Sequence, residues 1–179
     1  MSNISPLRLW SMRLVFVALA LVILLGDLLP LQTVPRGWAG PDLLFCLALI
    51  WSVRAPDYVP VFLLATLFLL ADFLLSRPPG LAAAMMLLAC SNLQSWMSRN
   101  RDTGLTGEWL RATFLIFGVM IAYRLALVIL FVPAPPLGLA VFQAFMTTLF
   151  YPAMIALSAF GFGVRFAVPG EYDRMGQRS

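Results

Sequence analysis

The sequence contains no histidine and no lysine, and only 11% of its 179 residues are charged. The absence of histidine removes the commonest general base and the commonest metal ligand. Cys46 and Cys90, the two cysteines, lie inside apolar runs, which indicates buried thiols and not a disulfide framework or a metal cluster. The sequence also lacks a phosphate-binding glycine loop and a serine-nucleophile elbow. It therefore predicts a protein that is not an enzyme and that uses no cofactor or metal.

Apolar residues dominate what remains, at 61% of the chain. A soluble domain typically has about 25% charged residues. A chain of this size cannot hide so much apolar surface in a globular core, so lipid is its natural solvent. Backbone polar groups in lipid must be satisfied within each span, which favours helices. The fold class predicted is an all-α polytopic membrane bundle.

Prolines, glycines and arginines divide the apolar sequence into six runs. They cover residues 14–31, 41–54, 58–75, 81–97, 109–132 and 137–164, and residues 165–179 follow as a short polar tail. The first run is longer than the apolar part of a signal peptide and no small-residue cleavage site follows it, so an uncleaved span is predicted. The second run is short for a crossing, unless it begins near Trp38 and ends on a snorkelling Arg54. We expect a single integral membrane domain over residues 1–179.

The distribution of arginine tests whether the second run crosses. With six crossings and a cytoplasmic N-terminus, only Arg36 and Arg77 fall in outside loops between the spans. If the second run dipped in and returned, Arg99, Arg101 and Arg111 would face outward, against the positive-inside rule. The sequence therefore predicts a multi-pass protein of the bacterial inner membrane with both termini in the cytoplasm. The net charge of +4 then reflects topology and not nucleic-acid binding.

A few charged residues collect at one depth, in the outer half of the predicted membrane. They are Asp27, Asp42, Asp72, Arg77 and Arg124. Charges in lipid usually pair or face a cavity, so mutual pairing is expected, with Arg124 against Asp72 or Asp27. Asp42 also suits the first turn of a helix, where the helix dipole favours an anion. The cluster is either a structural network that fixes helix packing or a pocket or docking site that opens outward. A proton relay is less favoured, because it would need acids at several depths.

Three segments, in order, resemble a known family. Gly40–Leu49 (GPDLLFCLAL) resembles the P-D-L-L-L signature of the rod shape-determining protein MreD family. Trp51–Pro60 (WSVRAPDYVP) resembles the family's short cytoplasmic turn, and Ala71–Gly80 (ADFLLSRPPG) resembles the end of its third helix. Asp42, Asp72 and Arg77 are the charged motif positions that this resemblance covers.

The resemblance implies a non-enzymatic scaffold of the cell-elongation machinery, which supports side-wall peptidoglycan synthesis and rod shape. The implied partner is MreC, through its transmembrane helix. Through MreC the implied links reach MreB, the RodA glycosyltransferase and the elongation-specific penicillin-binding transpeptidase. The family is also similar in its six-helix fold to the S-component of energy-coupling-factor transporters. The alternative function is therefore a small-molecule transporter or binding subunit with an outward-facing polar pocket.

Overall fold

The computed structural model describes residues 6–29, 39–100 and 103–162. These residues form six α-helices and one 3-10 turn, and no strand occurs among them. In chain order the elements are α1 (Pro6–Leu28), α2 (Leu43–Arg54), η1 (Pro56–Tyr58), α3 (Val61–Leu74), α4 (Leu81–Arg99), α5 (Gly104–Ile129) and α6 (Leu137–Phe162). The all-helical class predicted from the sequence is confirmed.

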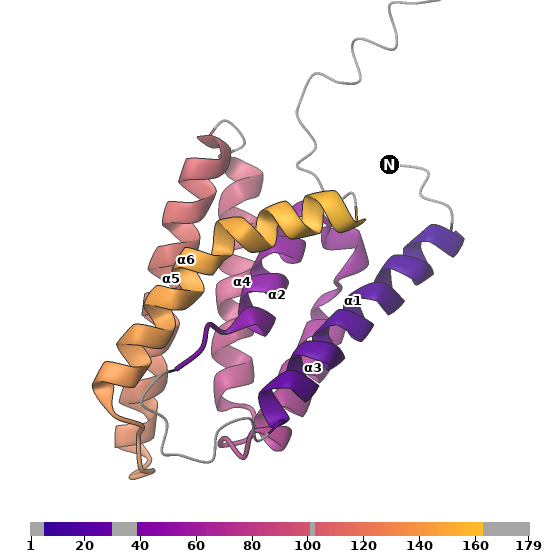
Figure 1. The fold of residues 1–179 in the computed structure, drawn as a ribbon. Coiled ribbons are helices and arrows are strands. Elements are labelled where there is room, and N and C mark those ends of the chain that lie inside the picture. The colour runs from indigo at the N-terminus through magenta and orange to yellow at the C-terminus, as the bar shows by residue number, and fades with distance from the viewer. Residues whose placement is uncertain (1–5, 30–38, 101–102, 163–179) are drawn as a thin grey trace, which may run out of the picture.

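Helix α2 is the centre of the bundle. It packs against α1, α4 and α6, while α3, α4, α5 and α6 pack in sequence around it (Figure 1). Every residue from Leu44 to Ser52 is buried. The helix is apolar on all sides because protein surrounds it on all sides. Trp51 is fully buried and its ring lies 5.2 Å from that of Phe16 on α1. The segment that carries the P-D-L-L-L resemblance is thus the core of the molecule.

The outer surface is apolar, as a lipid-facing surface would be. Within the described residues, three helices are long and apolar enough to cross a membrane: α1, α5 and most of α6. Helices α2 and α3 are shorter, and the 12 residues of α2 cover about 18 Å at about 1.5 Å per residue. Trp38 and the predicted tail 165–179 lie outside the described residues. The described residues thus include three helices that could cross a membrane, and six crossings remain a prediction.

Two helix ends with the same backbone geometry shape one end of the bundle. After α3, Ser76 has a φ of 54° and Arg77 N–H donates to the Asp72 carbonyl at 2.9 Å. After α5, Phe131 has a φ of 54° and Val132 N–H donates to the Leu127 carbonyl at 2.9 Å. Both are Schellman-type ends with a left-handed residue, and prolines follow each of them. They turn the chain sharply at the mouth of the cavity described below.

Helix α6 joins the two ends of the bundle. Pro152 lies inside it, and Figure 1 shows the helix bending so that its C-terminal part passes across α2. A proline inside a helix removes one backbone hydrogen bond and clashes with the preceding turn, which is the usual cause of such a bend. Trp51 on α2 donates its indole N–H to Ser158 Oγ on α6 at 3.3 Å. The bend thereby places α6 over the C-terminal end of the central helix.

Candidate functional site

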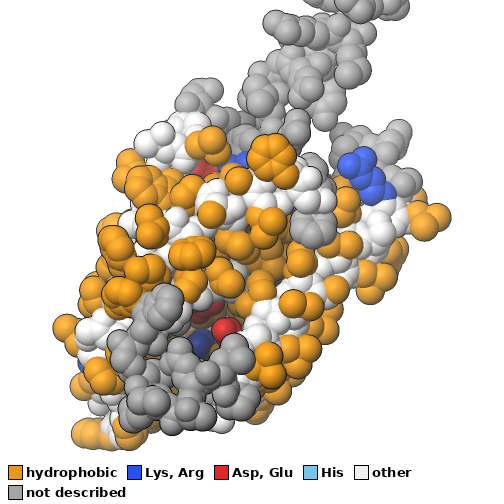
Figure 2. Space-filling model, viewed as in Figure 1, with side chains coloured by type: hydrophobic (Ala, Val, Ile, Leu, Met, Phe, Trp, Pro, Cys, Tyr) orange, Lys and Arg blue, Asp and Glu red, His pale blue; other side chains and the backbone are white. Residues whose placement is uncertain are grey.

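A cavity of about 320 Å³ lies between α4, α5 and α6, at the end where α2 begins. The turns after α3 and after α5 complete its wall, through Arg77 and Pro78 on one side and Pro133 and Pro135 on the other. Most of the lining is apolar, with Met86, Met120 and similar side chains. In Figure 2, acidic and basic side chains appear in a hollow on an otherwise hydrophobic face. This volume falls in the range of small-molecule sites.

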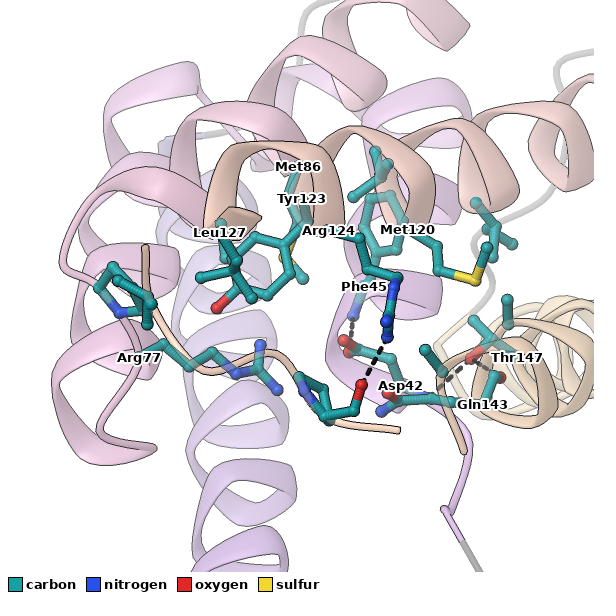
Figure 3. Close-up of a pocket in the computed structure, with 18 of the residues that line it drawn as sticks. Asp42, Phe45, Arg77, Met86, Met120, Tyr123, Arg124, Leu127, Gln143 and Thr147 are labelled. Atoms are coloured by element: carbon teal, nitrogen blue, oxygen red, sulfur yellow. Dashed lines mark hydrogen bonds between the residues drawn. The ribbon is translucent and has the colours of Figure 1, made fainter. Parts of the chain in front are cut away.

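Two arginines face this cavity from different elements. Arg124 lies on α5 and donates an N–H to the carbonyl oxygen of Pro135. Arg77 enters from the turn after α3, and Figure 3 shows both side chains directed to the same part of the cavity. Within the described ranges, neither guanidinium forms a salt bridge with an acidic side chain. The predicted pairing of Arg124 with Asp72 or Asp27 is therefore wrong.

Asp42 lies on the cavity wall as the N-cap of α2. Its Oδ1 accepts a hydrogen bond from Phe45 N–H at 2.9 Å, and its own N–H donates to Thr147 Oγ1 on α6 at 2.9 Å. The sequence-based assignment of Asp42 to a helix start is confirmed. A carboxylate at this position satisfies a helix donor that would otherwise lack a partner. Asp42 thereby holds α2 to α6 at the cavity floor.

Asp72 also binds the end of a helix, and not an arginine. It is 1% exposed, and its Oδ2 accepts hydrogen bonds from Gly80 N–H at 3.0 Å and Ala83 N–H at 3.1 Å. These are donors at the start of α4, so Asp72 on α3 caps the next helix along the chain. Gly80 has a φ of 84°, which favours glycine. Two backbone donors at a helix N-terminus are a better partner for this carboxylate than a distant guanidinium, which explains why the expected ion pair is absent.

Asp27 joins the same region from α1. A second, small cavity of about 10 Å³ is lined by Asp27, Asp42, Asp72 and Arg77. The five charged residues singled out from the sequence are therefore distributed around two adjoining cavities, with Asp42 and Arg77 common to both. The structure brings these residues together around the two cavities: Asp42 and Asp72 bind backbone N–H groups at helix starts, and Arg77 and Arg124 face the larger cavity.

The sequence analysis missed a buried network at the opposite end of α2. Arg54 Nη2 lies 2.8 Å from Glu108 Oε2, and the two side chains are 4% and 0% exposed. Tyr151 donates its hydroxyl to Glu108 Oε1 at 3.0 Å, so one carboxylate joins α2, α5 and α6. Arg54 is not the snorkelling residue expected, because its charge is satisfied inside the protein. Glu108 lies directly before the predicted fifth run, which begins at residue 109, and the sequence analysis assigns it no role.

No protein-family model, curated protein or solved structure matches the chain. Within the described ranges, no group of three or more cysteine, aspartate or glutamate side chains is placed to hold a metal ion. What the arrangement offers is cationic groups on an apolar cavity at one end and a closed ion-pair network at the other.

Proposed function

We propose that this chain is a non-enzymatic scaffold of the cell-elongation machinery in the bacterial inner membrane. It binds the transmembrane helix of an MreC-type partner and through it supports side-wall peptidoglycan synthesis. The proposal rests on the three segments that resemble the MreD family, Gly40–Leu49, Trp51–Pro60 and Ala71–Gly80. It includes six crossings and cytoplasmic termini, as the positive-inside rule favours.

One structural observation supports an architectural role. Asp42 and Asp72, acids of the first and third resembling segments, accept hydrogen bonds from backbone N–H groups at the starts of α2 and α4. Both groups lie at the cavity end of the bundle, where they hold the starts of α2 and α4. Residues bound in this way hold a shape and are poorly placed to act as acids or bases. A fixed bundle with an apolar exterior is what presents a constant surface to a partner helix in lipid.

Co-purification tests the scaffold proposal. The tagged chain is extracted from native membranes in a mild detergent, and retained proteins are identified by mass spectrometry. We expect an MreC-type protein to be retained with the wild-type chain and with Arg99→Gln, an exposed position at the end of α4 outside the three segments. Asp72→Ala is expected to retain less of it at equal chain levels. If no such protein is retained by the wild type, the scaffold proposal is wrong.

A second candidate function is favoured by the cavity itself. A transporter subunit or binding subunit needs a site of small-molecule size with a few polar groups on apolar walls. The cavity lined by Arg77 and Arg124 has that character. Uptake or binding of a solute by the purified chain would favour this candidate, and a chain that retains MreC without binding any solute would favour the scaffold.

A further inference from the structure

The wall of the larger cavity has more positive than negative side chains. Arg77 and Arg124 bring two positive charges, and Asp42 brings one negative charge that already accepts a hydrogen bond from Phe45 N–H. Arg124 donates one guanidinium N–H to the carbonyl oxygen of Pro135, and its other N–H groups do not take part in this hydrogen bond. No hydrogen bond joins the Arg77 guanidinium to any described residue. The wall of the larger cavity therefore offers several guanidinium donors and two positive charges against one negative charge, while Asp27 and Asp72 lie with Arg77 around the adjoining small cavity.

These donors lie beside apolar surface. Met86, Met120 and Leu127 line the same cavity, and the carbonyl and rings of the proline turns close one side. Both arginines are half-buried, so an anion that accepts from them beside this apolar surface is bound more strongly than in bulk water. Arginine matches the oxygens of carboxylate and phosphate through its planar fork.

We propose that this cavity binds an amphiphilic anion, with a phosphate or carboxylate between Arg77 and Arg124 and an apolar portion against Met86 and Met120. The inference is independent of the scaffold function and deepens the second candidate. Phosphate chemistry of this kind comes either from an anionic phospholipid of the surrounding membrane or from a water-soluble compound. The two sources share the recognition groups and differ in whether acyl chains are needed.

Binding is measured on the full chain in a zwitterionic detergent, by native mass spectrometry and by the melting temperature. The probes are dihexanoyl-phosphatidylglycerol, dihexanoyl-phosphatidylcholine with the same chains, and inorganic phosphate. We expect the phosphatidylglycerol probe to bind and to raise the melting temperature, and the phosphatidylcholine probe to do neither. Binding of phosphatidylglycerol without binding of inorganic phosphate assigns a lipid. Equal binding of both would show that the apolar portion contributes nothing, which overturns the amphiphilic part of the proposal.

Substitutions localise the effect. Arg77→Gln and Arg124→Gln are each expected to weaken the apparent Kd of the phosphatidylglycerol probe at least about tenfold, because each removes a charged donor. Arg99→Gln is the matched control, since Arg99 is exposed at the far end of α4. Ala140→Phe narrows the cavity while both arginines stay, so it keeps the test decisive if an arginine variant fails to fold.

The proposal is overturned if no anionic probe binds the wild type. It is also overturned if binding is unchanged in both arginine variants, or in Ala140→Phe, relative to Arg99→Gln. None of these outcomes depends on retention of MreC, so the scaffold proposal and the anion site fail or stand separately.

Discussion

At the scale of single residues, buried charges in this protein are satisfied in two different ways. Asp42 and Asp72 bind backbone N–H groups at helix starts, whereas Glu108 binds Arg54 and Tyr151. A carboxylate in a helix cap accepts hydrogen bonds from N–H groups that have no acceptor within the helix. A carboxylate in an ion pair depends on a single counter-charge, so its loss leaves that charge buried. The two kinds of site predict different responses to substitution.

Asp72→Ala is expected to lower stability by about 1–3 kcal/mol, because the half-buried N–H of Gly80 and the buried N–H of Ala83 would lose their acceptor. Asp72→Asn keeps an acceptor oxygen and is expected to lose less. Asp57→Ala, exposed on η1, serves as the control. The melting temperature of the purified variants in detergent measures the order. An alanine variant that melts with the wild type would contradict the capping role.

Glu108→Ala is expected to be more damaging, by about 3–5 kcal/mol, because it breaks a buried ion pair with Arg54. Tyr151→Phe removes only one hydrogen bond to the same carboxylate and should cost about 1 kcal/mol. The chain level in membranes and the melting temperature both report the difference. Equal effects of the two substitutions would show that the ion pair contributes little.

At the scale of elements, the helices were largely predictable and their partners were not. Prolines and glycines in the sequence mark the ends of α3, α4, α5 and α6 well, because these residues end or begin helices for local reasons. Asp42 was assigned to a helix start correctly for the same reason. The partner of Asp72 was missed, since it required knowing that α4 starts beside the end of α3. Glu108 was missed as well, although Arg54 and Glu108 fall at the same predicted depth with opposite charges, and that signal could have paired them.

The left-handed residue after α3 gives an element-scale prediction. Ser76 has a φ of 54°, which glycine adopts freely and a β-branched residue adopts poorly. Ser76→Gly is expected to leave stability unchanged or slightly raised, and Ser76→Val to lower it by about 1–2 kcal/mol. Melting temperatures of the two variants are compared directly. Equal melting of the valine and glycine variants would argue against a left-handed residue at this turn.

At the scale of the whole molecule, the described residues place charge at both ends of a bundle whose exterior is apolar (Figure 2). The cavity with Arg77 and Arg124 lies at one end, and the Arg54–Glu108–Tyr151 network lies towards the other. In the predicted topology the first end faces outward and the second faces the cytoplasm. The ends are therefore chemically distinct, and orientation in the membrane decides which compartment meets the cavity.

Orientation is tested by labelling single cysteines in intact cells with a membrane-impermeant maleimide. Pro79→Cys, exposed beside the cavity, is expected to react from outside, and Asn100→Cys, exposed after α4, only after the cells are lysed. Cys46 and Cys90 are buried and serve as the unlabelled background. Labelling of Asn100→Cys in intact cells, with Pro79→Cys protected, would reverse the topology.

The central position of α2 also has a consequence for the order of synthesis. Some of its hydrogen-bond partners are synthesised much later, on α6. The Asp42 N–H donates to Thr147, and the Trp51 indole N–H donates to Ser158. Helix α2 has only 12 residues, which is short for a membrane crossing. Until α6 has been synthesised, α2 lacks the packing contacts that α6 provides. We therefore expect α2 to be incompletely packed until α6 is present, and chains that stop before α6 to be degraded faster in the membrane than the full chain.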